Sequence, residues 1–236
     1  MKRGFIRCLW GDFKWTDPHV INSKIYMEIH NTLKNQYLHP FMTFVWGEDN
    51  FSFLESLGVD CELVHKKSIQ WENEDHHFRH KLESYRIALE DKGFDEIVHL
   101  DWDTIPTRLM DSNFWNILEQ RESIQACLYR LNHTTCLWRD NGPAKRQVTN
   151  ANFIYFRDKS FPSRIIDIWD NFPDERKYKF NDEIAISYFI DELNQKWIGA
   201  SEYHNRYEPM VADMKRFSIF KNKNKHELYK NYFRHS

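Results

Sequence analysis

Residues 96–106 join an apolar run to two aspartates, and they constrain the fold more than any other segment. Residues 96–100 have the apolar, β-type character of a strand. Asp101 and Asp103 follow directly, and Pro106 ends the segment. Because side chains two residues apart on an extended chain point to the same side, these carboxylates are expected to face one point beyond the strand. The alternative interpretation is a strand end with two solvated acids.

Two carboxylates aimed at one point form a donor set that suits a hard divalent cation. Mg²⁺ and Mn²⁺ prefer oxygen ligands, keep several waters and take further ligands from substrate phosphates. In parallel α/β sheets, ligands bind outside the carboxyl ends of the strands, which is where Asp101 and Asp103 would lie. We therefore expect a Mn²⁺ or Mg²⁺ site at this edge of the sheet.

Strand-like and helix-like segments alternate along the chain. This order predicts one doubly wound α/β domain, with a central, mostly parallel twisted sheet flanked by helices. Besides residues 96–100, the expected strands are 4–10, 41–46, 61–65, 124–129, 151–156 and 196–198. The expected helices are 19–33, 50–57, 77–91, 112–121, 160–169 and 182–193. Gly58 and Gly93 are expected to end two of the helices, and residues 130–148 are expected to form a long polar loop.

The composition argues against several classes of protein. The chain has only seven glycines and no G-x-G-x-x-G or G-x-x-x-x-G-K motif, which disfavours a glycine-rich phosphate cradle. It has no apolar run of membrane-spanning length, and residues 1–4 lead straight into a strand rather than a signal sequence. Its four scattered cysteines form no close pairs, so we expect reduced thiols and a cytoplasmic protein, in the host cytoplasm if the protein is viral.

Positive charge gathers at the C-terminal end. The formal net charge is −2, but residues 214–236 contain seven Lys or Arg against one acid, so this segment is +6 and the remainder −8. Five aromatic residues are interleaved with these charges. Such a segment could hold an anionic partner such as nucleic acid or a lipid surface. The alternative interpretation is a solvated tail or a terminal helix that packs its aromatics on the domain.

The order of four motifs resembles that of a known family. A first strand ends in an aromatic-Gly-Asp loop at residues 10–13, and Asp101-x-Asp103 follows the later apolar strand. Asn-Ala-Asn-Phe-Ile-Tyr-Phe at 150–156 and Asn-Asp-Glu-Ile-Ala at 181–185 come next. Over residues 4–205 this order resembles the GT-A fold glycosyltransferases, which use nucleotide sugars and a divalent metal. The resemblance implies a nucleotide-sugar half over about 1–105, an acceptor half over about 106–213, and a tail or helix at 214–236.

For the metal, the resemblance implies a third ligand beside Asp101 and Asp103. The candidate is His204, whose neutral imidazole would favour Mn²⁺ over Mg²⁺. The metal would bridge the phosphates of a donor such as a UDP-sugar and act as Lewis acid for the leaving group. His204 is otherwise a surface histidine, and residues 204–209 lack the Gly and Lys of the His-x-x-Gly-x-x-Lys-Pro motif found in a retaining branch of the family.

For the donor, the resemblance implies that Trp10, Asp12 and Trp15 hold the base and ribose, by stacking and by accepting hydrogen bonds. Lys81, and after it Arg79, would meet the pyrophosphate from the helix ahead of the acidic strand. The alternatives are that Trp10 is a core residue of its strand, and that the two basic residues lie on a solvated helix face.

On the acceptor side, the resemblance implies that Asp182 or Glu183 is the catalytic carboxylate. It would be the general base of an inverting enzyme, or it would stabilise positive charge on the sugar in a retaining one. Both acids could instead only favour the N-terminus of a helix. Asn152 would hydrogen-bond a hydroxyl of the donor sugar, and Asp101 also belongs to the donor site.

Four functions remain open at this point. The leading interpretation is sugar transfer to a glycan hydroxyl. The second is the same transfer to a hydroxylated base in phage DNA, which the basic, aromatic tail would favour because such an enzyme must grip phosphates and extrude a base. Nucleotidyl transfer that makes a sugar nucleotide normally needs a glycine-rich, lysine-bearing first loop, which this sequence lacks. A tryptophan-rich carbohydrate-binding domain would not need paired acids at a strand end.

Overall fold

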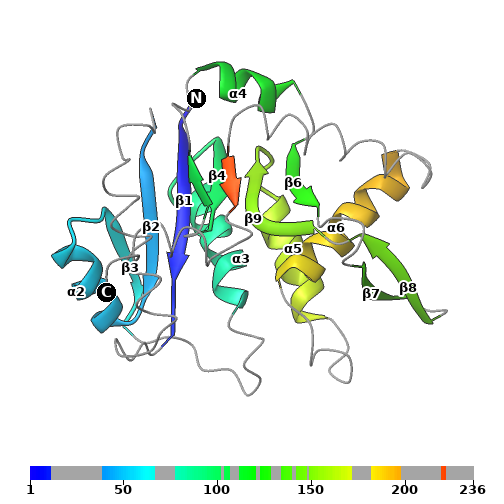
Figure 1. The fold of residues 1–236 in the computed structure, drawn as a ribbon, viewed down its shortest axis with the longest axis horizontal. Helices are drawn as coiled ribbons and strands as arrows, with labels where there is room; N and C mark the ends of the chain where they lie inside the picture. Colours follow the sequence, from blue (N-terminus) through cyan, green and yellow to red (C-terminus); the bar gives the residue numbers. More distant parts are fainter. Residues whose placement is uncertain are drawn as a thin grey trace, which may run out of the picture.

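The computed structural model is a mixed α/β domain built on one central sheet (Figure 1). It describes residues 1–11, 39–66, 78–101, 104–106, 112–120, 123–128, 134–139, 142–147, 149–171, 182–197 and 219–221. The strands are β1 (Arg3–Leu9), β2 (Phe41–Trp46), β3 (Cys61–His65), β4 (Glu96–Leu100), β5 (Thr104–Pro106), β6 (Ile124–Leu128), β7 (Thr134–Arg139), β8 (Gly142–Gln147), β9 (Thr149–Phe156) and β10 (Ile219–Lys221). The helices are α2 (Glu48–Ser56), α3 (Arg79–Arg86) with its π-helical continuation η3 (Ile87–Asp91), α4 (Ser112–Glu119), α5 (Phe161–Asp170) and α6 (Asp182–Trp197).

The central sheet has the strand order β3-β2-β1-β4-β9-β6 among the described strands. β1 pairs in parallel with β2 and with β4, and β2 pairs in parallel with β3. β9 is antiparallel to both of its neighbours, β4 and β6. Five of the six strands therefore run in one direction, which confirms the predicted mostly parallel sheet.

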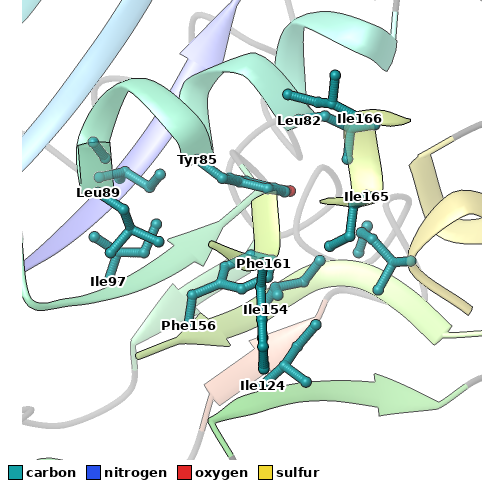
Figure 2. Packing of buried hydrophobic residues seen from close by; sticks show 14 of the residues in the cluster. Leu82, Tyr85, Leu89, Ile97, Ile124, Ile154, Phe156, Phe161, Ile165 and Ile166 are labelled. Carbon is teal, nitrogen blue, oxygen red and sulfur yellow. The ribbon is translucent and has the colours of Figure 1, made fainter. Parts of the chain in front are cut away.

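The two faces of the sheet carry separate layers of helices. Ile6 and Cys8 of β1 belong to the larger core, which packs against α3, η3, α5 and α6. Phe5 faces the other side, where Phe114 and Trp115 of α4 cover it. Figure 2 shows the larger core, in which residues of η3, α5, β4 and β9 surround the side chain of Tyr85.

Most expected elements are present, two expectations were wrong, and the helix expected over residues 19–33 lies outside the described residues. Gly58 and Gly93 adopt φ values of 68° and 66°, in the left-handed region where glycine is favoured, and each follows a helix as expected. Residues 134–139 and 142–147, expected to be loop, form the paired strands β7 and β8. Among the described strands, β7 and β8 pair with each other and not with the central sheet. Their sequence accordingly lacks the apolar alternation of a core strand. Residues 196–197, expected to be strand, lie in α6.

The basic C-terminal segment contributes a strand in its described part. β10 pairs antiparallel with β5, with Lys221 opposite Thr104. This pairing brings the segment beside the residue that directly follows Asp103. None of the helices in the described ranges has the length and apolar character needed to cross a bilayer.

A buried ion pair lies at the amino end of β4. Glu96 is fully buried, and its two carboxylate oxygens accept hydrogen bonds from Arg3 Nε at 2.8 Å and from the hydroxyl of Tyr155 at 2.9 Å. These groups come from β1, β4 and β9, which are neighbours in the sheet. Because both oxygens are satisfied, the carboxylate can be buried without an unpaired charge.

We expect Glu96→Gln to destabilise the fold. It removes one of the two carboxylates that pair with Arg3, the other being that of Glu119, and it replaces a charged hydrogen-bond acceptor with a neutral one. The loss should be about 1.5–3 kcal/mol, the range for a hydrogen bond to a charged group. Urea denaturation gives this value. The control is Glu62→Gln, because the side chains of Glu62 and Lys92 are 37% and 34% exposed, and its cost should stay below ~1 kcal/mol. Equal losses in the two variants would contradict the prediction.

Candidate functional site

The candidate site lies at the carboxyl edge of the parallel strands. The chain runs from β1 outward to β2 and β3 and then returns to β4 on the other side of β1, so the strand order reverses between β1 and β4. Trp10 follows β1 and Asp101 follows β4 at this edge. Because β9 runs in the opposite direction, its first residues lie beside the end of β4, where Phe153 pairs with Leu100. In doubly wound sheets, ligands bind at such a reversal point.

Asp101 is held by the ammonium group of Lys81. Lys81 Nζ lies 2.8 Å from Asp101 Oδ1, and Lys81 is only 6% exposed. Burial alone would raise the pKa of Asp101, but the charge of Lys81 and a hydrogen bond from His99 outweigh it and hold this pKa well below its usual range. Asp101 is therefore ionised at neutral pH. The alternative interpretation, that Lys81 lies on a solvated helix face, was wrong.

Asp182 is the second anion at this lysine. Its Oδ2 lies 3.2 Å from Lys81 Nζ, and the residue is 1% exposed at the start of α6. Burial raises the pKa of Asp182, and the nearby Lys81 opposes this rise. Burial would also lower the pKa of Lys81, but the carboxylates of Asp101 and Asp182 outweigh it and raise that pKa. The third contact of the ammonium is the backbone oxygen of Ala151, at 3.5 Å.

His99 lies two residues before Asp101, and its side chain contacts the carboxylate of Asp101. Its Nε2 lies 3.1 Å from Asp101 Oδ1, and His99 is 1% exposed. Burial lowers the pKa of His99, so the imidazole is neutral and donates from Nε2 to the carboxylate. The ring of Tyr85 lies against it at 5.1 Å between centroids. Among the described residues, neither His99 Nδ1 nor the Tyr85 hydroxyl has a hydrogen-bond partner.

The remaining described candidates have different surroundings. Glu183 is half-buried, and its Oε1 accepts the backbone N–H of Ala151 at 3.1 Å. Arg79 donates to Glu83 at 3.0 Å and to Asp170 at the end of α5 at 3.2 Å, so its guanidinium joins two helices. Trp10 is half-buried rather than a full core residue. Its ring stacks on His80 with centroids 5.7 Å apart and also contacts Phe78 edge-on.

The structure thus brings Lys81, Asp101 and Asp182 together, as the sequence-based assignment to one site requires. Asp12, Trp15, Asp103 and His204 lie outside the described residues, as does the side chain of Asn152 in β9. Within the described ranges, no three His, Cys, Asp or Glu side chains gather as a metal site would require.

Sequence reasoning missed two buried polar residues at this edge. His99 could have been found, because its spacing of two from Asp101 on a strand places both side chains on the same face. Asn50, in the first turn of α2, had no such signal. Its Nδ2 donates hydrogen bonds of 2.8 Å to the backbone oxygens of both Gly11 and Trp46.

No protein-family model and no curated protein matches this sequence. Three solved structures are similar in fold. Mouse xyloside xylosyltransferase 1 has 10% identity and a TM-score of 0.45, over 84% of this chain and 83% of that one. The bifunctional glycosyltransferase WbbM has 11% identity and a TM-score of 0.46, and the match covers 80% of this chain but only 37% of that one. A Bacillus anthracis protein assigned as a glucose-1-phosphate thymidylyltransferase has 12% identity and a TM-score of 0.43, over 84% of each chain. All three likenesses are distant.

We expect Lys81→Met to destabilise the protein in a pH-dependent way. At pH 7 the variant would bury Asp182 without its counter-ion, which should cost about 3–5 kcal/mol. Burial already raises the pKa of Asp182 in the wild type, and loss of the Lys81 charge raises it further in the variant. The folded variant therefore takes up more protons than the folded wild type as the pH falls, so its free energy of unfolding rises more steeply. The deficit of the variant should therefore shrink between pH 7 and pH 5, as measured by urea denaturation.

The matched control is Lys159→Met, because the pair between Lys159 and Asp95 is about half exposed on both sides. Its small deficit should not depend on pH in this range. A Lys81→Met deficit that is the same at pH 7 and pH 5 would contradict the assignment of Asp182 as its anionic partner.

Proposed function

We propose that this chain is a glycosyltransferase that moves a sugar from a nucleotide-sugar donor, a UDP-sugar in our leading version, to a hydroxyl of a glycan. The observation that supports the proposal is the meeting of Lys81, Asp101 and Asp182 where the strand order reverses between β1 and β4. Doubly wound sheets bind nucleotides at this place. An ionised carboxylate at the end of a strand is also the group that a metal–diphosphate complex needs.

A divalent cation, Mn²⁺ or Mg²⁺, is part of the proposal. Both contacts of Asp101 fall on Oδ1, so Oδ2 has no ion pair or hydrogen bond to the described residues. The side chain is 26% exposed and ionised, as a cation ligand must be. These properties fit a metal ligand, and Asp103 and His204 would complete the set. When bound, the ion would neutralise the charge that develops on the leaving nucleoside diphosphate.

In this proposal Lys81 acts through Asp101 rather than on the diphosphate. Its three N–H groups have three neighbours, which are the carboxylates of Asp101 and Asp182 and the backbone oxygen of Ala151. Arg79 is likewise engaged by Glu83 and Asp170. We therefore propose that the metal, rather than Lys81, binds the diphosphate, and that Lys81 fixes the orientation of Asp101.

Of the two acids at the start of α6, Glu183 is the better acceptor-side carboxylate. Asp182 is almost fully buried against Lys81, whereas Glu183 is partly exposed. One oxygen of Glu183 holds the backbone of β9 at Ala151, beside Asn152. A carboxylate that is partly exposed and held in place in this way could take the proton of an acceptor hydroxyl.

The first test of the proposal is donor turnover. Wild-type protein with UDP-sugars and Mn²⁺ should release UDP, and EDTA should stop the release. Asp101→Asn should lower kcat/KM at least about 100-fold, because it removes a charge that stabilises the transition state. The control is Asp95→Asn, which changes an exposed acid that pairs with Lys159.

Three outcomes would count against this version of the function. Turnover that EDTA does not stop would contradict the metal dependence. Absence of turnover with every nucleotide sugar would contradict the assignment as a transferase. Transfer to DNA with hydroxylated bases, but not to glycans, would show that the acceptor is DNA and not a glycan.

The second test separates the two acids. Glu183→Gln keeps an oxygen for the backbone N–H of Ala151 but cannot accept a proton, so kcat for transfer should fall about 100-fold or more while the donor KM stays within threefold. Asp182→Asn should instead change stability as well as activity. Steady-state kinetics together with thermal unfolding separates these cases. Full activity of Glu183→Gln would show that this acid only holds β9 and the start of α6.

A further inference from the structure

His99 is a polar side chain in an otherwise apolar part of the central sheet. Its neighbours in β4 are Val98 and Leu100, and its partners on the adjacent strands are Ile6 of β1 and Ile154 of β9, all of them buried. His99 itself is 1% exposed, and its Nδ1 has no hydrogen-bond partner among the described residues. Burying a polar atom without a partner lowers stability, so an apolar side chain would suit this position better. The histidine therefore needs a reason other than packing.

The side chain of His99 donates a hydrogen bond to Asp101. Its Nε2 lies 3.1 Å from Asp101 Oδ1. Because an ionised carboxylate can only accept, Nε2 must carry the hydrogen, whether or not Nδ1 also carries one. His99 belongs to β4, and Asp101 follows the last residue of the same strand. The contact therefore depends on the local geometry of one strand rather than on how a helix packs against it.

Lys81 alone would not fix the plane of the Asp101 carboxylate. Its ammonium group lies 2.8 Å from Asp101 Oδ1, but it is shared with Asp182, whose Oδ2 is 3.2 Å away. A carboxylate held at one oxygen by one donor can still rotate about the bond to Cβ, and this rotation moves the other oxygen. His99 places a second donor on the same Oδ1, from β4 rather than from α3. The two donors together restrict the rotation and so determine where Oδ2 lies.

The imidazole of His99 is itself held in place by Tyr85. The two rings meet edge to face, at an interplanar angle of 66° and with their centroids 5.1 Å apart. Tyr85 is fully buried in α3, four residues after Lys81, and its ring also lies 5.1 Å from that of Phe156 in β9. α3 therefore orders Asp101 in two ways, directly through the ammonium of Lys81 and indirectly through the ring of Tyr85.

We propose that His99 is a positioning residue that holds Asp101 in the orientation that binds the divalent cation. This inference rests on the proposed function, and it adds a residue that touches neither the cation nor the two substrates. Groups that hydrogen-bond a metal ligand commonly change the affinity for the metal by about 10- to 100-fold. The buried contact of His99 with Oδ1, the oxygen that Lys81 also holds, suits this role.

The test compares His99→Gln with His99→Met. Both side chains are unbranched and similar in length, and both lack the imidazole ring, but only glutamine can donate an N–H to Asp101. The probe is Mn²⁺, titrated into the protein with and without UDP and followed by the electron paramagnetic resonance signal of free Mn²⁺. The Kd for Mn²⁺ should rise at least about tenfold in His99→Met and stay within about threefold of the wild-type value in His99→Gln. Equal Kd values in the two variants would overturn the inference.

Thermal unfolding separates this role from a structural one. Methionine leaves no unpaired polar atom at position 99, so His99→Met should melt at or above the temperature of His99→Gln while it binds Mn²⁺ more weakly. If the less stable variant is instead the weaker binder, His99 has only a structural role and the inference is wrong. His65→Met, which changes an exposed histidine at the end of β3, is the control and should leave the Kd unchanged. If neither variant of His99 folds, Tyr85→Leu, which removes the ring contact, should weaken Mn²⁺ binding, and an unchanged Kd would then overturn the inference.

Crystal structures of the two variants without metal keep this inference separate from the proposed function. The carboxylate of Asp101 should keep its orientation in His99→Gln and should turn, or occupy two orientations, in His99→Met. A turned carboxylate in a protein whose wild type binds no Mn²⁺ would reject the cation and the role of His99 in binding it, while showing that His99 orders Asp101. Turnover that requires Mn²⁺, together with an unchanged carboxylate in His99→Met, would reject the positioning role alone.

Discussion

The ammonium group of Lys81 lies where an apolar core would exclude a charge, and separate parts of the chain meet to neutralise it. Asp101 comes from the end of β4, Asp182 from the start of α6, and a backbone oxygen from the start of β9. Burying any one of these charges alone would cost several kcal/mol, about the size of the whole folding free energy of many domains. The groups therefore depend on one another, and their pairing fixes how the two halves of the sheet meet at the candidate site.

The two ends of β4 show how burial separates a structural charge from a functional one. At the amino end, Arg3 and Tyr155 each donate a hydrogen bond to one oxygen of Glu96, so both oxygens of this carboxylate have partners within the fold. At the carboxyl end, Asp101 uses one oxygen for both Lys81 and His99 and keeps partial exposure. Four buried residues separate the two acids. The same strand thus anchors the sheet at one edge and presents an ionised group at the other.

Periodicity predicted the sheet and most helices because the central strands and the buried helix faces are apolar in the expected pattern. The resemblance to the GT-A fold glycosyltransferases implied that Lys81, Asp101 and Asp182 belong to one site. Their direct ion pairs could not be predicted, because these depend on how α3 and α6 cross the sheet. The hairpin β7–β8 was missed because it lies outside the main sheet and its residues are mostly polar.

Asn50 was missed for a different reason. Its importance lies in two backbone oxygens rather than in any pattern of side chains. An asparagine in the first turn of a helix is ordinary in a sequence, and only the positions of the strand ends show what it bonds. Residues of this kind are found from coordinates, whereas a strand-end aspartate is already visible in the sequence.

The antiparallel direction of β9 determines where the chain can be lengthened. β6 ends at the edge that carries Asp101, and β9 begins at that same edge, with Leu128 opposite Thr149. The hairpin β7–β8 lies between these two points in the chain, so it leaves and returns beside the site without crossing the sheet. Insertions or deletions there would leave the register of every strand of the central sheet unchanged. In the proposed glycosyltransferase, this hairpin is therefore a place where the chain can vary in length while the contacts of Lys81 with Asp101 and Asp182 stay the same.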